Sequence, residues 1–277
     1  MIELIKLLVA GAFIGVATTI SGLSGGVLMV SLGAYEKVVE ALSNIFKGFK
    51  KNIAILFPLV VGVVLGYFLL NQLLTFTLAN YPLVTVLFFC GIMFGGISIM
   101  HKKSGGDIKK ISNLLILVLA FVAVLYLTFL LRVGPTVSLG ELELVDYVML
   151  LAMGGVIAVT LIIPGINTTS ALLFFGYYAP IQDAIYALFQ WEDVSRNVLI
   201  LIPVLCGTII GLGLIANLIR LLLSKCQAKV YFALLGVLLA TLITIFIQVD
   251  ISIEVGHIMI GALAAVVGFV GAVKLSD

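Results

Sequence analysis

The chain has 277 residues, of which 63% are hydrophobic and only 10% are charged, with a net charge of +2 and a mean hydropathy of +1.33. A soluble domain needs roughly a quarter of its residues charged to cover its surface. The composition therefore predicts an all-α polytopic membrane protein with a single transmembrane domain over residues 1–277. No basic patch interleaved with aromatic residues is present, so a nucleic-acid partner is excluded. The three cysteines have no CxxC spacing, and neither a metal site nor another cofactor is expected.

Ten apolar segments follow one another along the chain, five in each half. The first half contains them at residues 3–20, 24–47, 52–74, 81–101 and 112–131. The second half contains them at residues 147–163, 168–190, 197–219, 230–248 and 257–274. Segments three to five of each half approach the 20 residues that a helix needs to cross a hydrocarbon core of roughly 30 Å. They are predicted to be three transmembrane helices in each half.

The first two segments of each half have a different pattern. They meet at a polar break, "SGLSGG" (21–26) in the first half and "PGINTTS" (164–170) in the second. The segment after each break becomes charged or polar after about a dozen apolar residues. Two short arms around a polar break are typical of a re-entrant hairpin, which enters and leaves the membrane on one face. Two full spans are the alternative, which gives ten spans instead of six spans and two hairpins.

The two halves repeat one sequence pattern. A shift of 143 residues places Gly11, Gly22, Gly33 and Tyr35 on Gly154, Gly165, Gly176 and Tyr178. A shift of 145 residues places "KNIAILFPLVVGVVLG" (51–66) on "RNVLILIPVLCGTIIG" (196–211). Helix-breaking and polar residues coincide together, which chance similarity between apolar segments does not readily produce. We therefore assign repeat 1 to residues 1–132 and repeat 2 to residues 145–277.

The placement of charges predicts the topology. Basic residues gather in the loops at 47–51, 101–110 and 220–229, whereas the loop at 141–146 is acidic. If the basic loops are cytoplasmic, the number of spans between them places both termini in the cytoplasm and gives the two repeats opposite orientations. Inverted repeats with broken helices that meet near the bilayer midplane are typical of secondary transporters.

The two breaks are predicted to form an anion site. Irregular backbone at membrane depth is tolerated where it is buried in protein or lines a wet cavity. A helix restarts after each break, and the N–H groups and partial positive charge of a helix N-terminus suit a phosphate or a carboxylate. Close packing of helices through small residues is the alternative explanation. The candidate substrate-binding residues at the breaks are Ser21, Gly22, Ser24, Gly25 and Gly26 in repeat 1, and Gly165, Asn167, Thr168, Thr169 and Ser170 in repeat 2.

Charged residues follow about three turns after the breaks. Lys37 either attracts an anionic headgroup or forms an interfacial pair with Glu36 or Glu40. Glu36, Glu40 and Asp183 are candidates for a carboxylate that carries a coupling ion, a proton or sodium.

The segments "ISGLSGGVLMVSLGAYEKVVEAL" (20–42) and "IPGINTTSALLFFGYYAPIQDAI" (163–185) resemble the two signature segments of the bacterial polyprenyl-phosphate transporters. The family pattern is approximately PGxSGGT…GxY in the first half and PGxSGS…GxY in the second, and the resemblance covers essentially the whole chain. Its tyrosines match Tyr35 and Tyr178, which adds both to the candidate substrate-binding residues. The sequence departs from the pattern at Ser21, where the family has proline, and at residues 167–169, which replace Ser-Gly-Ser.

The resemblance implies a translocase of the bacterial inner membrane, not an enzyme, that returns undecaprenyl phosphate to the inner leaflet for reuse in cell-envelope synthesis. An ion-coupled carrier of a small anion is the first alternative. A polyprenyl-pyrophosphate phosphatase is the second, but neither break has the Arg, His or Glu that such chemistry requires. A structural membrane protein does not explain two matched polar breaks.

Overall fold

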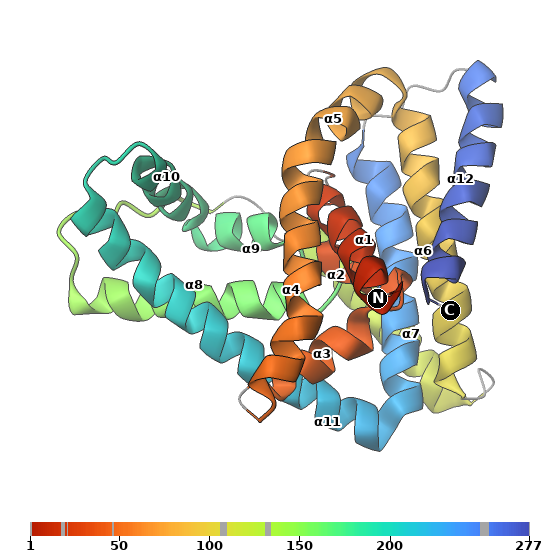
Figure 1. The fold of residues 1–277 in the computed structure, drawn as a ribbon, viewed down its shortest axis with the longest axis horizontal. Helices are drawn as coiled ribbons and strands as arrows, with labels where there is room; N and C mark the ends of the chain where they lie inside the picture. Colours follow the sequence, from red (N-terminus) through yellow and green to blue (C-terminus); the bar gives the residue numbers. More distant parts are fainter. Residues whose placement is uncertain are drawn as a thin grey trace.

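The structure, a computed structural model, describes residues 2–17, 20, 22–45, 47–105, 110–130, 134–249 and 255–276. Within these residues the regular elements are all helical, which confirms the predicted all-α class (Figure 1). The elements are α1 (Ile2–Ala17), α2 (Gly25–Ser31), α3 (Tyr35–Ser43), α4 (Phe49–Leu65), the π-helix η1 (Gly66–Leu70), α5 (Asn71–Asn80), α6 (Pro82–Ser104), α7 (Ile111–Leu130), α8 (Leu144–Ile162), α9 (Thr168–Phe175), α10 (Tyr178–Phe189), α11 (Val194–Gln248) and α12 (Val255–Ser276).

Six helical stretches among the described residues are long and apolar enough to cross a membrane, so the chain is a multi-pass membrane protein. They are Phe49–Asn80, Pro82–Ser104, Ile111–Phe129, Leu144–Ile162, Val194–Gln248 and Gly256–Ser276. The stretch over α11 has 55 residues, which would measure about 80 Å as a straight helix and exceeds one crossing. The backbone is non-helical at Cys226, where α11 turns sharply, and its two parts match the predicted segments 197–219 and 230–248 (Figure 1).

The second apolar segment of each repeat is divided into two short helices. Gly33 separates α2 from α3 with a φ of +72°, and Gly176 separates α9 from α10 with a φ of +78°. These two glycines are equivalent in the repeat, and so are Gly22 and Gly165, whose φ angles are +86° and +94°. Positive φ favours glycine because it has no Cβ. The four short helices have 7, 9, 8 and 12 residues, fewer than a crossing requires. α8 differs from the prediction: its segment was expected to be one short arm of a hairpin, but the helix is long and apolar enough to cross a membrane.

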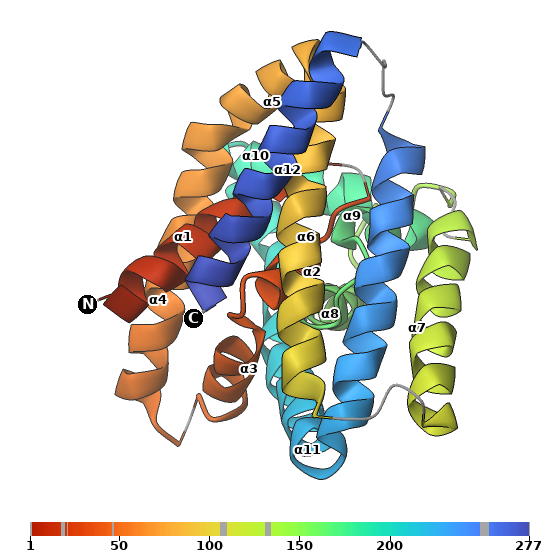
Figure 2. The ribbon, with the colours of Figure 1, turned by 90° about the vertical axis from the view of Figure 1, so that its right-hand side faces the viewer.

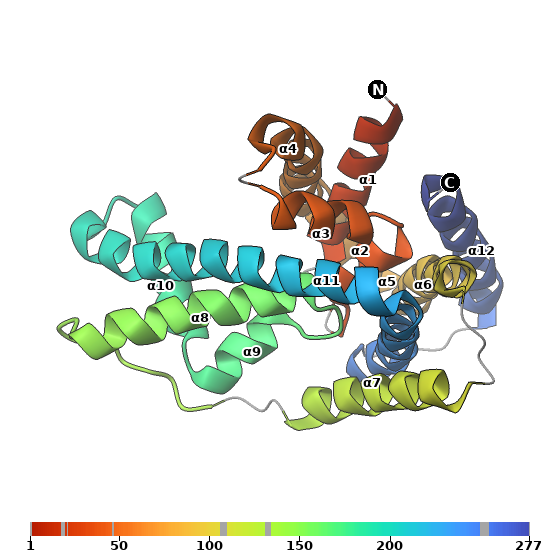
Figure 3. The same ribbon diagram turned by 90° about the horizontal axis from the view of Figure 1, so that it is seen from below.

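The same helix crossing occurs in both repeats. α1 packs against α4, and α8 packs in the same way against the first part of α11 (Figure 3). A Cβ at Gly11 would overlap the carbonyl oxygen of Leu59, and a Cβ at Gly154 would overlap that of Val204, the equivalent residue. Small residues therefore let the two backbones approach closely, as is common between membrane helices.

The last helices of the two repeats pack crosswise. α6 of repeat 1 lies against α12 of repeat 2, and the second part of α11 lies against α7 of repeat 1 (Figure 2). Equivalent glycines mediate both contacts: a Cβ at Gly91 would overlap the carbonyl oxygen of Ala265, and one at Gly236 would overlap that of Leu117. This exchange joins the two repeats in one body.

Substitution of Gly207 by valine is expected to destabilise the protein by about 1–3 kcal/mol, because a Cβ there overlaps the carbonyl oxygen of Leu151 on α8. Gly213→Val on the same helix is the matched control, since a Cβ at Gly213 has no atom within 4 Å. Thermal unfolding of the purified protein in detergent measures the difference. Equal stability of the two variants would contradict the close crossing of α8 and α11.

Candidate functional site

The two polar breaks meet in the structure. The hydroxyl oxygen of Ser24 accepts a hydrogen bond from the backbone N–H of Gly165, with an N···O distance of 3.1 Å. Beside this contact, a Cβ at Gly26 would lie 3.0 Å from the Cα of Pro164, so the absence of a Cβ lets the two segments approach closely. The two breaks, whose residues 22–26 and 164–167 are called the tips below, therefore touch, although Ser24 and Gly165 lie 141 residues apart in the sequence.

Each tip begins a helix that is capped by its own side chain. Ser24 is the N-cap of α2, and its hydroxyl also accepts from the N–H of Val27 at 3.3 Å. Asn167 is the N-cap of α9, and its side-chain oxygen accepts from the N–H groups of Thr169 and Ser170 at 2.8 and 3.4 Å. Such caps satisfy donors that a helix N-terminus otherwise leaves open.

A small polar cavity lies between the tips. Its volume is about 30 Å³, close to the share of one water molecule in the liquid. It is lined by both breaks and by two long helices, through Gly22, Ser24, Val124, Leu127, Thr128, Gly165, Ile166, Asn167, Ser170, Thr241, Thr244 and Gln248. The hydroxyls of Thr128, Thr241 and Thr244 donate to carbonyls one turn earlier in their own helices.

The remaining polar residues of the breaks lie beside this cavity or outside the described residues. The hydroxyls of Thr168 and Thr160 lie 2.7 Å apart, which ties the start of α9 to α8. Thr169 is exposed. Gly25 packs against Ile14, whose Cγ2 would lie 2.8 Å from a Cβ at that position. Ser21 lies outside the residues that the structure describes.

The candidate residues after the second glycine of each hairpin do not line the cavity. Tyr35 is buried at the start of α3, and Tyr178 is half-buried at the start of α10. Lys37 forms an ion pair with Glu3 of α1 at 2.5 Å, and not with Glu36 or Glu40. The hydrogen bond from Lys37 and its positive charge lower the pKa of the Glu3 carboxyl below its usual value. Because both side chains are largely exposed to solvent, the pair contributes little to stability.

The three candidate coupling carboxylates have different surroundings. Glu36 accepts from the Lys103 ammonium on α6 at 3.0 Å and from the hydroxyl of Tyr231 on α11, so it ties the first hairpin to two long helices. Glu40 is exposed on α3. Asp183 lies at a separate cavity of about 370 Å³, described next.

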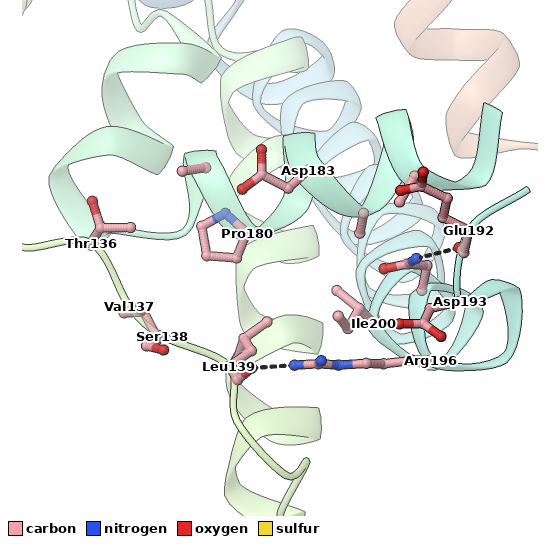
Figure 4. Close-up of a pocket in the computed structure, with 14 residues that line it drawn as sticks. Thr136, Val137, Ser138, Leu139, Pro180, Asp183, Glu192, Asp193, Arg196 and Ile200 are labelled. Atoms are coloured by element: carbon pink, nitrogen blue, oxygen red, sulfur yellow. Dashed lines mark hydrogen bonds between the residues drawn. The ribbon is translucent and has the colours of Figure 1, made fainter. Parts of the chain in front are cut away.

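This second cavity lies between α10 and the extended segment 134–143 (Figure 4). Asp183, Glu192 and Asp193 line it together with Arg196, whose guanidinium donates to the carbonyl oxygens of Leu139 and Gly140. Arg196 therefore holds the connecting segment 134–143 through these hydrogen bonds and does not contact the break between α8 and α9.

Sequence reasoning missed the polar wall that α7 and α11 contribute to the central cavity. Thr241, Thr244 and Gln248 recur at spacings of three and four residues within an apolar segment, which places them on one face of a helix. That periodicity in a span is the signal that could have identified them.

Replacing Ser24 by alanine is expected to lower the free energy of unfolding by about 1–3 kcal/mol, because it removes an N-cap and leaves the Gly165 N–H without this acceptor. Ser31→Ala is the matched control in the same helix, since the buried Ser31 hydroxyl donates only to the carbonyl of Val27; its expected cost is below about 1 kcal/mol. Denaturation in detergent micelles compares them. Equal losses would show that the contact between the tips contributes nothing to stability.

Comparison with known proteins places this chain in a family. Residues 14–259 match the family model described as undecaprenyl phosphate translocase-like. A polyprenyl-phosphate transporter of Vibrio cholerae is 27% identical over 248 residues, covering 84% of this chain and 74% of the relative. A polyprenyl-phosphate transporter of Staphylococcus aureus is 22% identical over 271 residues, covering 96% of this chain and 93% of the relative. No solved structure matches significantly. Because the family model covers most of its length, this multi-pass membrane protein belongs to the undecaprenyl phosphate translocase-like family.

Proposed function

We propose that the protein is a transporter of polyprenyl phosphate, in which the phosphate passes between the two hairpin tips. The observation that carries the proposal is the hydrogen bond between Ser24 and Gly165, because it brings the matched polar breaks of the two repeats to one place. Membership of the translocase-like family and the names of the two relatives support the same substrate.

The tips carry the groups that a phosphate needs. When the tips separate, the Gly165 N–H and the Ser24 hydroxyl lose each other as partners and become available to an anionic oxygen. The N-terminus of α9 adds its partial positive charge. Threonine hydroxyls on α7 and α11 line the same space, and in this proposal they turn from their helix carbonyls to donate to the phosphate. A phosphate can be held by such donors without a buried arginine.

The size of the cavity indicates how the transporter works. A space of about 30 Å³ is too small for a phosphate, so in this proposal the described conformation is the one in which the tips are closed. Transport in this proposal separates the tips toward one side of the membrane and then toward the other. In this proposal the repeats 1–132 and 145–277 have opposite orientations in the membrane, and the broken hairpin of each is re-entrant. The two hairpins then act as equivalent gates, one for each side of the membrane. The matched φ angles at Gly22 and Gly165 support this repeat assignment.

The proposed direction is from the outer to the inner leaflet of the cytoplasmic membrane, with both chain termini in the cytoplasm. The resulting lipid carrier is then reused in cell-wall biogenesis. The termini lie close together, in agreement with a common side: the C-terminal Ser276 packs at Gly33, and Glu3 pairs with Lys37 of the same hairpin. A proton or sodium ion is proposed to drive the cycle, with Glu36 as the best-placed carboxylate because it joins the first hairpin to α6 and α11.

Bulky apolar residues at the tips are expected to abolish transfer. Ser24→Leu and Thr169→Leu should each reduce the transfer of undecaprenyl phosphate between liposome leaflets to the rate without protein, because they fill or screen the phosphate path. Gly213→Leu is the control, because it adds the same side chain away from the tips, at a position where a Cβ has no atom within 4 Å.

Two further measurements separate the alternatives. Flux of soluble phosphate in place of the lipid would indicate a small-anion carrier, and phosphate release from a polyprenyl pyrophosphate would indicate an enzyme. Transfer at the full rate by both leucine variants would refute the proposed path.

A further inference from the structure

A large apolar groove lies directly beside the polar cavity. It has a volume of about 630 Å³ and runs between α8, α9 and the first part of α11. Small residues on α8 and α11, among them Gly155 and Gly211, create its depth, and the rings of Phe174 and Phe175 border it on α9. Polar atoms contribute little to its lining.

The groove and the polar cavity share a wall. Leu127 and Ile166 line both spaces. Thr160 lines the groove, and its hydroxyl lies 2.7 Å from that of Thr168, the first residue of α9. A molecule with its polar end between the tips therefore has an apolar space adjoining it on this side.

Only one of the two matched hairpins borders this space. In α2 the residues from Gly26 to Ser31 are all buried, because α6 packs against them. In α9 the equivalent arm leaves Phe174 and Phe175 40% and 45% exposed. The two arms occupy equivalent positions in the repeat and differ in covering, so the described conformation is open to an apolar ligand at α9.

We propose that this groove receives the isoprenoid chain of the substrate at the point where the chain leaves the phosphate; the inference rests on the proposed function. A phosphate held between the tips stays covalently attached to its chain, so the chain has to leave the site laterally between helices. Lipid tails are as apolar as leucine side chains, so an isoprenoid chain gains little binding energy by moving from the bilayer into the groove. The groove instead provides a path for the chain. Because Leu127 and Ile166 line both spaces, the groove begins where a chain attached to the phosphate would leave the polar cavity.

Gly155→Phe tests the proposal because Gly155 lines the groove and a Cβ there has no atom within 4 Å, so the ring can enter the groove. We expect transfer of undecaprenyl phosphate in proteoliposomes to fall at least about tenfold, which corresponds to about 1.4 kcal/mol on the barrier. Binding of a soluble five-carbon prenyl phosphate, whose chain does not reach along the groove, should be unchanged. Gly213→Phe, equally open but outside the groove, should transfer like the wild type.

The outcomes distinguish the two proposals. If the wild type fails to transfer undecaprenyl phosphate, the proposed function fails and the groove inference fails with it. If the wild type transfers the lipid and Gly155→Phe does so at the same rate, only the groove inference is overturned. If Gly155→Phe loses both the binding of prenyl phosphate and the transfer of the lipid, the groove inference is also overturned, because the substitution then acts on the phosphate site.

A second measurement uses the wild type, so that it does not depend on the folding of a variant. A polyprenyl phosphate carrying a photoreactive diazirine on its chain should label peptides of α8 and α9, and unlabelled polyprenyl phosphate should compete. Labelling confined to other helices, or equal labelling by a diazirine phospholipid, would show that the groove holds only bulk lipid and would overturn the inference.

Discussion

The constraint on which the structure depends is that backbone polar groups within an apolar environment need partners. Each unsatisfied group costs several kcal/mol where water is absent. This chain interrupts its helices twice in apolar surroundings, and the two interruptions partly satisfy each other. The Ser24 hydroxyl accepts from the Gly165 N–H of the other repeat while it also caps its own helix, and Asn167 caps α9. The contact is therefore structural, and in the proposed function it is also the place that opens, because its groups then bind the anion.

Glycine makes this arrangement possible in two ways. At Gly22 and Gly165 the positive φ turns the chain at each tip, and at Gly26 the absence of a Cβ lets the tips touch. Along the helices, glycines at equivalent places bring α1 onto α4 and α8 onto α11. The tips are thus held by two matched helix crossings, and the crosswise packing of α6 with α12 and of α7 with α11 joins them. A movement of one repeat against the other would act directly on the contact between Ser24 and Gly165.

Much of this fold follows from periodicity and composition. The apolar segments, the second glycine of each hairpin and the matched breaks are visible in the sequence because helix-breaking residues recur at a shift of 143. The meeting of the breaks was also predicted, from symmetry alone. The partners were not: Lys37 pairs with Glu3, and Glu36 meets Lys103 and Tyr231, which are 67 and 195 residues away. The crosswise packing of the last helices, and the different covering of α2 and α9, were also missed. Local patterns do not encode such contacts, because they depend on how whole helices pack.

The most direct test of the account is to lock the tips together. Gly26→Cys and Pro164→Cys are placed for a disulfide, because a Cβ at residue 26 would lie 3.3 Å from the Cβ of residue 164. A shift of a few tenths of an ångström brings this distance into the usual range of about 3.5–4.5 Å. The experiment measures undecaprenyl phosphate transfer by this pair, in a chain without its three natural cysteines, before and after oxidation and against each single variant. The account predicts that oxidation reduces transfer to the protein-free rate and that reduction restores it. Full transfer by the oxidised, cross-linked protein would contradict the claim that the phosphate passes between the tips.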